Sequence, residues 1–257
     1  MEININCDLG EKSKLHSDHN DPELLSIVNS ANIACGYHAG DEETMNKVVQ
    51  ISKKNNVSIG AHPSFKDIEN FGRKRLNLNS SEIKKLIIDQ YEILQTIASK
   101  HNEKVTHIKP HGALNNMACE DMELSITIAK TIEEIDKNLI YLVPTGSKME
   151  TAGNRFNLNI ACEIFADRNY EDDGNLVSRS KENALITDPN LAKSHVLKMV
   201  KNQSLNCLSG KQIPCKIDSI CIHGDNRSSL DTAKIIKNEL RDNGLTLKPL
   251  NKMKKFI

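Results

Sequence analysis

Acid, base and metal-ligand side chains recur in this sequence at one kind of position, directly after a short apolar run. His38, His62, His111 and His223 each follow such a run, and Asp8 closes the first one. Imidazole and carboxylate groups can transfer protons, and together they can bind a divalent metal ion. One histidine beside a turn is usually a hydrogen-bonded structural residue, but four in the same relative position indicate a shared functional cleft.

Two carboxylates stand close together after the first run. Asp8 and Glu11 are three residues apart, so the pair could divide into an acid and a base if repulsion and burial separate their pKa values. The alternative is that Glu11 caps a turn and only Asp8 takes part in chemistry. Asp167 follows a later apolar run, and we expect it to line the same cleft.

The same side chains contain a candidate site for a divalent metal ion. Its ligands would come from Asp8, His38, His62 and His111, because zinc and similar ions accept carboxylate and imidazole donors. The sequence has no H-x-x-x-H or H-x-H motif, so such a site depends on the fold to bring distant residues together.

Three cations are candidates for contacts with an anionic group. Lys109 stands at the end of a central run, where it could pair with a substrate carboxylate or stabilise a developing oxyanion. Arg73 and Arg168 lie in two long polar stretches and could hold a carboxylate or phosphate through bidentate bonds. Neither G-x-x-x-x-G-K-[ST] nor G-x-G-x-x-G occurs, so a nucleotide would have to bind without either fingerprint.

The elements that must position these residues alternate between strand-like and helical patterns. Short apolar runs that end in polar, ligand-type residues occupy residues 3–7, 31–35, 57–61, 105–108, 160–165 and 219–222. Residues 139–143 form a continuous apolar run typical of a buried parallel strand, and residues 245–247 form a short last strand. Strands whose polar ends converge on one site are typical of a β/α barrel.

Helices are predicted between these runs from their caps and their apolar periodicity. Asp21 is the expected cap of one helix, with Pro22 at its first position, and Ser80 is the expected cap of a strongly periodic one. Further helices are expected at residues 121–135, 190–201 and 229–243. We therefore predict one α/β domain over residues 1–257, a TIM-like barrel of seven or eight strands.

Composition and charge exclude several classes of protein. Lys plus Arg and Asp plus Glu both number 34, aromatic residues make up 4% and Trp is absent, which argues against nucleic-acid and anionic-membrane partners. The seven cysteines include no C-x-x-C pair, so they are interpreted as structural. Without a signal-peptide pattern or an apolar run of membrane length, a cytoplasmic protein is expected.

Seven blocks of the sequence, taken together, resemble the LamB/YcsF family. They run in family order from residue 6 to residue 225, as N-C-D-L-G-E, S-A-N-I-A-C-G-Y-H-A-G-D, I-G-A-H-P, F-G-R, H-I-K-P-H-G-A-L, E-I-F-A-D-R-N-Y-E-D-D-G-N-L-V and C-I-H-G-D. Beside them, Asn115 stands where the family usually has Tyr, and residues 64–66 differ from its usual G-Y-P. These departures bear on the fit of a substrate rather than on the fold.

The resemblance implies a distorted β/α barrel similar to those of polysaccharide deacetylases and glycoside hydrolases. It also implies the A subunit of an ATP-dependent 5-oxoprolinase, which converts 5-oxo-L-proline, ATP and water to L-glutamate, ADP and phosphate with separate B and C subunits. Arg73, Asp167 and Arg168 would then bind the substrate. The other implied site residues are catalytic: Asp8, Glu11, His38, His62, Lys109, His111 and His223.

The ATP-coupled reaction suggests a mechanism and two rival functions. ATP would phosphorylate the amide oxygen of the lactam and water would attack C5, with Asp8 and a histidine activating the nucleophile while Lys109 and His111 stabilise charge on oxygen. One rival is a metal-dependent amidohydrolase or deacetylase that acts without ATP. The other is a non-catalytic subunit that only binds 5-oxoproline, although several acid and base groups at strand ends favour catalysis over binding.

Overall fold

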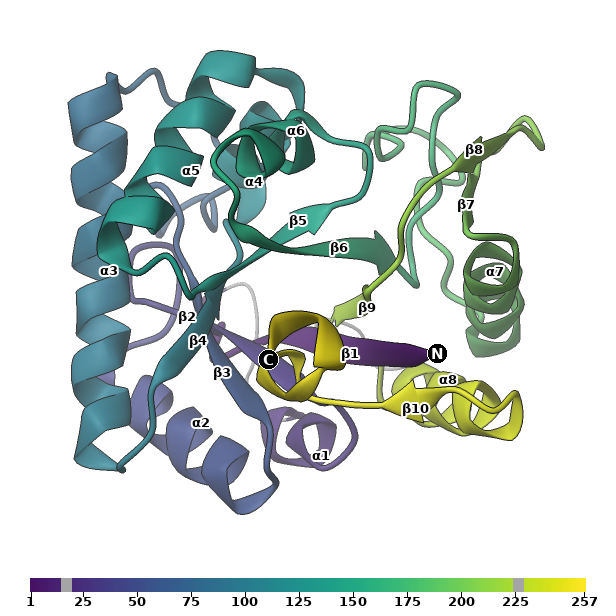
Figure 1. The fold of residues 1–257 in the computed structure, drawn as a ribbon, viewed down its shortest axis with the longest axis horizontal. Coiled ribbons are helices and arrows are strands. Elements are labelled where there is room, and N and C mark those ends of the chain that lie inside the picture. The colour runs from purple at the N-terminus through teal and green to yellow at the C-terminus, as the bar shows by residue number, and fades with distance from the viewer. Residues whose placement is uncertain (15–19, 224–228) are drawn as a thin grey trace.

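Seven parallel strands close into a barrel in this computed structural model, which describes residues 1–14, 20–223 and 229–257 (Figure 1). The barrel closes because the first strand pairs with both the second and the last of the seven. The predicted α/β barrel is therefore confirmed. In barrel order the strands are β1 (Glu2–Leu9), β2 (Ser30–Ala34), β3 (Ser58–His62), β4 (Val105–Ile108), β5 (Ile140–Pro144), β6 (Asn159–Phe165) and β9 (Ser219–His223).

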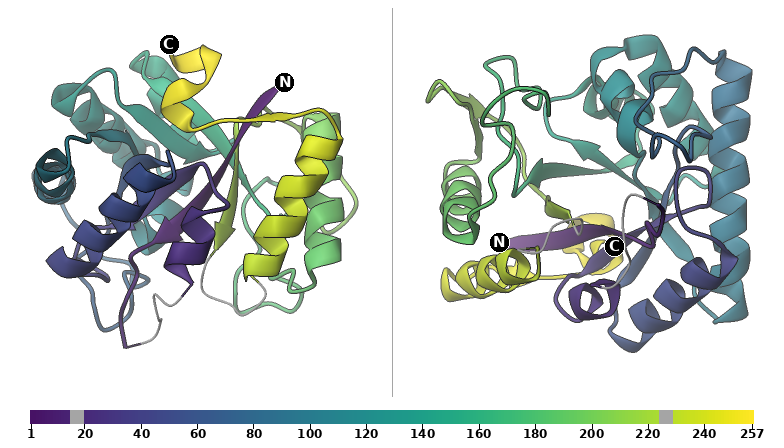
Figure 2. Two further views of the ribbon diagram at one scale, coloured as in Figure 1. Left: turned by 90° about the horizontal axis from the view of Figure 1, so that it is seen from below. Right: turned by 180° about the vertical axis from the view of Figure 1, so that it is seen from behind.

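Helices surround the strands, as the two views of Figure 2 show. Their bounds are α1 (Asp21–Leu25), α2 (Glu42–Lys54), α3 (Ser80–Lys100), α4 (Gly112–Glu120), α5 (Met122–Ile135), α6 (Lys148–Arg155), α7 (Pro189–Asn202) and α8 (Ser229–Asp242). A separate antiparallel hairpin joins β7 (Ser204–Asn206) to β8 (Gln212–Pro214). Among the described residues, no helix combines the length and apolar character needed to cross a membrane.

Two of the predicted helix caps are wrong by one residue. The cap of α3 is Asn79, whose side chain accepts hydrogen bonds from the backbone N–H groups of Ser81 and Glu82. Asparagine is among the best capping residues, and Glu82 completes a capping box that was not predicted from the sequence. The residue before α1 is Asn20, and the Asp21 carboxylate instead accepts from the N–H of Gly10 at 2.8 Å.

The side chains of β1 show how the barrel divides into an outer and an inner face. Ile3, Ile5, Cys7 and Leu9 join the apolar core between the strands and the helices. The alternate residues of β1 point inward, because successive side chains of a strand face opposite sides. They are polar and almost fully buried: Asn4, Asn6 and Asp8.

Hydrogen bonds satisfy this polar interior from strand to strand. Asn32 of β2 donates to Asn6 Oδ1 and to Asp8 Oδ1, each at 2.8 Å. Asn6 in turn donates to Ser219 Oγ at 2.8 Å and to Glu163 Oε2 at 3.2 Å. A buried polar group without a hydrogen-bond partner would lower the free energy of unfolding by about 1–3 kcal/mol. The barrel can therefore keep a polar interior only because these hydrogen bonds pair its groups.

A glycine makes room for one member of this network. Gly60 of β3 lies opposite His107 of β4, and a Cβ at Gly60 would lie 2.1 Å from His107 Nε2, the atom that contacts Asn32 Oδ1 at 3.0 Å. We expect Gly60→Ala to displace the ring and lower the free energy of unfolding by about 1–3 kcal/mol, measured by urea denaturation. In a His107→Ala background, Gly60→Ala should lower the free energy of unfolding much less, because no ring is left to displace. An equal decrease in both backgrounds would show that the contact with His107 is not the cause.

The opposite end of the barrel is covered by the C-terminal segment, drawn in yellow in Figure 1. Strand β10 (Thr246–Leu247) pairs with the start of β1, and two short 3₁₀-helices follow, η1 (Leu250–Lys252) and η2 (Lys254–Phe256). Leu250 and Met253 pack there against the apolar residues Ile140, Leu142 and Ala161. Among the described residues, the C-terminal segment therefore covers the end of the barrel opposite to the carboxyl ends of the strands.

Candidate active site at the carboxyl ends of the strands

A cleft of about 680 Å³ opens at the carboxyl ends of the strands. Most of the predicted site residues line it, which the barrel geometry explains, because strand ends that are distant in sequence meet there. They are Asp8, Glu11, His62, Arg73, Lys109, His111, Arg168 and His223. The other two predicted residues, His38 and Asp167, lie behind this surface and contact Glu11 and His223 respectively. Gly224 and Asp225 of the last sequence block lie outside the described residues.

Lys109 lies at the bottom of the cleft, where two carboxylates surround its ammonium group. Its Nζ lies 2.9 Å from Asp8 Oδ1 and 3.3 Å from Glu163 Oε2, and it also lies 3.1 Å from Cys221 Sγ. Burial opposes the charge, but Asp8, Cys221 and Glu163 outweigh it and raise the pKa of Lys109 well above its ordinary value. These contacts hold the Lys109 ammonium group against the Asp8 carboxylate. Contact of Lys109 with a substrate oxygen, expected from the sequence, stays a prediction.

Asp8 directs its other oxygen toward two imidazole rings. Its Oδ2 lies 3.5 Å from His62 Nε2 and 4.0 Å from His223 Nε2. Burial would raise the pKa of Asp8, but His62 and Lys109 outweigh it and hold this pKa well below the ordinary value. Asp8 is therefore an ionised carboxylate at neutral pH, with Oδ2 directed toward the two rings.

His223 and Asp167 form an oriented pair beside Asp8. His223 Nδ1 lies 2.9 and 2.8 Å from the two oxygens of Asp167, and the ring stacks on Phe165. Burial would lower the pKa of His223, but the Asp167 carboxylate outweighs it and raises the pKa. The carboxylate fixes a proton on Nδ1 and leaves Nε2 directed toward Asp8, an arrangement suited to general acid or base catalysis.

Removal of the Asp167 charge should shift the titration of His223. In Asp167→Asn, burial dominates, so we expect the imidazole NMR signals of His223 to titrate at lower pH than in the wild type. In the wild type the pair stabilises the folded protein below about pH 6.5 and loses this effect as pH rises through the raised pKa. Asp173→Asn, at an exposed carboxylate of the cleft rim, is the control. An unchanged midpoint in Asp167→Asn would reject the pairing.

The third group of the cleft gathers three histidines around Glu11. Glu11 Oε1 lies 3.2 Å from His38 Nε2, 3.1 Å from His111 Nδ1 and 3.8 Å from His62 Nε2. Burial opposes the charge of Glu11, but His111 and His38 outweigh it and hold the pKa of Glu11 well below its ordinary value. Three of the predicted metal candidates thus lie around Glu11: His38, His62 and His111. The donor atoms of Glu11, His38 and His111 lie within 4.8 Å of one another, while Asp8 Oδ1 is engaged by Lys109.

Four arginines line the cleft: Arg73, Arg75, Arg168 and Arg179. Arg168 is largely buried, donates from Nη2 to the carbonyl of Val177 at 2.6 Å and has no hydrogen-bond partner for Nε in the described chain. Arg73 lies over the ring of Phe71, and Arg179 also lines the cleft. Arg75 is paired with Glu120. These cations give the entrance the charge needed to attract an anion.

Several residues that support the site were not singled out from the sequence. Four of them contact Lys109 or Asp8, and each lies inside a strand with apolar residues on both sides of it in the sequence: Asn6, Asn32, Glu163 and Cys221. Burial raises the pKa of Glu163, which indicates a carboxylate that depends on Lys109 for its charge. Asn4, Asn6 and Asp8 alternate along β1, and this alternation is the one signal that could have identified part of the network.

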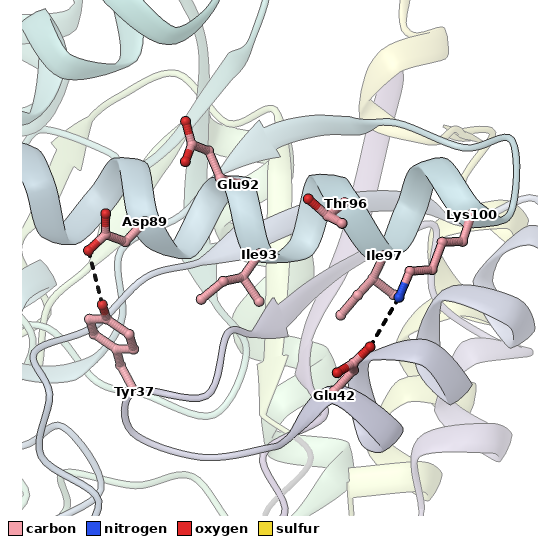
Figure 3. A pocket seen from close by; sticks show the side chains of 8 residues that line it. All are labelled: Tyr37, Glu42, Asp89, Glu92, Ile93, Thr96, Ile97 and Lys100. Atoms are coloured by element: carbon pink, nitrogen blue, oxygen red, sulfur yellow. Dashed lines mark hydrogen bonds and ion pairs between the residues drawn. The ribbon is translucent and has the colours of Figure 1, made fainter.

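A second groove, of about 530 Å³, lies on the outside of the barrel along α3 (Figure 3). Four of its polar groups bind one another in pairs: Tyr37 donates to Asp89 at 3.3 Å, and Lys100 pairs with Glu42 at 3.1 Å. No histidine is among the described residues that line it. The cleft at the strand ends is therefore the candidate active site.

A parallel barrel with acids, imidazoles and arginines at the carboxyl ends of its strands defines a β/α-barrel enzyme. Comparison with known proteins narrows this class. The chain belongs to the LamB/YcsF family, whose model matches residues 3–255. A relative from Nitrobacter hamburgensis, named as the A subunit of 5-oxoprolinase, is 42% identical over 255 residues, covering 99% of this chain and 100% of that protein.

Solved structures agree with this assignment. A lactam utilization protein from Thermus thermophilus superposes with a TM-score of 0.89 at 31% identity, covering 96% of this chain and 99% of the other. A peptidoglycan deacetylase from Bacillus subtilis superposes with a TM-score of 0.52 at 13% identity over 99% and 90% of the two chains. The second likeness concerns the fold alone and confirms the expected similarity to deacetylase barrels.

Proposed function

We propose that this chain is the A subunit of an ATP-dependent 5-oxoprolinase that acts in the cytoplasm with separate B and C subunits. The reaction would convert 5-oxo-L-proline and ATP to L-glutamate, ADP and phosphate with consumption of water. Relatives that carry this name over their full length support the proposal. The observation that carries it is Asp8, an ionised carboxylate held by Lys109 between two histidines at the bottom of an arginine-lined cleft.

The chemistry requires activation of a stable amide. Transfer of the γ-phosphoryl group of ATP to the lactam oxygen would make C5 a better electrophile, and water would then add to C5. The ring C–N bond would break as its nitrogen takes up a proton, leaving an acyl phosphate that a second water molecule hydrolyses to glutamate and phosphate. Each addition of water needs a base, and ring opening needs an acid.

The residues of the cleft would take these roles with the lactam bound beside Asp8 and His223. Asp8 Oδ2 would accept the proton of the attacking water, and His223, oriented by Asp167, would deliver a proton to the ring nitrogen. Arg73 and Arg168 would bind the ring carboxylate or the phosphoryl group. His111 contacts Glu11 and His62 at Nδ1 and the Phe71 carbonyl at Nε2, so it would support the site rather than stabilise charge on oxygen.

The decisive experiment measures glutamate release from 5-oxoproline with and without ATP, and with and without the B and C subunits. Glutamate formed only when ATP and both partners are present would support the proposal. ATP-independent release by this chain alone would favour the amidohydrolase instead. Binding of 5-oxoproline with no release in any combination of folded proteins would favour a chain that only binds the substrate.

A further inference from the structure

Backbone carbonyls fix the protonation of two histidines in the cleft. His62 Nδ1 lies 2.7 Å from the carbonyl oxygen of Lys109, and His111 Nε2 lies 3.0 Å from that of Phe71. A carbonyl oxygen can only accept a hydrogen bond, so both of these nitrogens carry a hydrogen. In the neutral rings the lone pairs are therefore on His62 Nε2 and His111 Nδ1.

Without a cation or a further proton between the rings, these two lone pairs would face each other. His62 Nε2 and His111 Nδ1 are 3.0 Å apart, and Glu11 Oε1 lies 3.1 Å from the second and 3.8 Å from the first. Three acceptors around one point repel one another unless a positive charge lies between them. Ligands at about 2.0–2.1 Å from a tetrahedral zinc ion would be roughly 3.3–3.4 Å apart, within the range of the spacings observed here.

We propose that Glu11, His62 and His111 bind one divalent transition-metal ion of the zinc type. Two imidazoles and one carboxylate leave a fourth position free, as in catalytic zinc sites, and all three residues line the cleft. The hydrogen bonds from His62 and His111 to backbone carbonyls orient both rings, the support that metal-bound histidines usually have. This binding property is independent of the proposed function.

Asp8 and His38, both in the metal set suggested by the sequence, are not ligands in this proposal. Asp8 Oδ1 accepts from Asn32 and from the Lys109 ammonium group. Its Oδ2 lies 3.5 Å from His62 Nε2, but the Lys109 charge on the same carboxylate would repel a second cation. The His38 ring lies flat on His111, with centroids 3.9 Å apart and an angle of 9° between the planes. Because a lone pair lies in the ring plane, stacked rings cannot both point at one ion. His38 is instead a positioning residue for Glu11.

The test is a calorimetric titration of the chelator-treated chain with ZnCl2, without 5-oxoproline, ATP or partners. We expect one ion per chain with micromolar or tighter affinity. Glu11→Gln and His111→Gln should weaken binding by at least about 100-fold, and His38→Gln by about 10-fold, as for a residue that supports a ligand. His101→Gln, at the end of α3, is the matched control and should leave the affinity unchanged.

Two further measurements keep the proposal open to refutation. Zinc should shift the NMR signals of His62 Nε2 and His111 Nδ1 in the wild type, so the result does not depend on folded variants. Absence of binding would mean that a shared proton, not a metal ion, separates the two rings, and would overturn the proposal. A second group of possible ligands has donor atoms within 4.8 Å of one another: Asp8, Cys221 and His223. Metal binding at this second group would also overturn the proposal. It would be revealed by a thiolate-to-metal absorption band with Co²⁺, or by zinc binding that is lost only in His223→Gln.

Discussion

Replacement of Asp8 by asparagine should lower glutamate release by the assembled enzyme by about 10²–10⁴-fold, the usual contribution of a positioned proton-transfer group. Asparagine preserves the size of the side chain and an oxygen for the bond from Lys109, but it cannot accept a proton from water. Initial rates with the B and C subunits at saturating ATP would measure the effect. Because the pKa of Asp8 is held well below its ordinary value, the wild-type rate should not decline through protonation of Asp8 near neutral pH.

A nearby carboxylate provides the control for this experiment. Asp173→Asn removes an acid from the exposed rim of the same cleft, where its side chain accepts hydrogen bonds from Asn175. Its activity should stay close to that of the wild type. Full activity in Asp8→Asn would remove Asp8 from the mechanism and favour a chain that binds substrate for chemistry elsewhere in the complex.

The second large effect concerns stability. In Lys109→Met the carboxylates of Asp8 and Glu163 lose their buried counter-ion, so we expect the free energy of unfolding to fall by about 3–5 kcal/mol at pH 7. Without Lys109 the folded-state pKa values of both acids rise, because burial disfavours their charge. The loss should therefore become smaller as pH falls and the acids are protonated. Urea denaturation at pH 7 and pH 5 would measure both effects.

Two comparisons isolate the buried charge as the cause. Lys148→Met removes a lysine from the exposed rim of the cleft, and the stability should change by no more than about 0.5 kcal/mol. Lys109→Met combined with Glu163→Gln removes one of the unpaired charges and should recover part of the loss. If Lys109→Met were as stable as Lys148→Met, the ion pairs at the bottom of the cleft would contribute little to the fold.

Much of the candidate site was predictable because of one topological rule. The carboxyl ends of parallel barrel strands meet, so His62, Lys109 and His223 had to come close together once their strands were identified. The same rule does not state which side chains touch. The contacts of Lys109 with Asp8 and Glu163, and the orientation of His223 by Asp167, depend on barrel closure and on rotamers, which no local pattern encodes.

The interior of the barrel shows a different limit of sequence reasoning. Alternation of apolar and polar residues usually indicates a strand with one face in solvent. In β1 both faces are buried. The polar face, with Asn4 and Asn6, is buried inside the barrel, where its hydrogen-bond partners come from β2, β6 and β9. The helix caps were missed for a local reason, since Asn79 and Ser80 are both good caps and only the backbone bonds decide between them.

Closure of the barrel between its first and last strands has a consequence for biosynthesis. The chain emerges from the ribosome with β1 first, yet β1 pairs with β9 and β10, which are made more than 200 residues later. Until then Asn4 and Asn6 lack their bonds to Ser219, and the base of the barrel lacks Leu250 and Met253. Such non-local pairing folds slowly, so the barrel stays open until its last strands have been made.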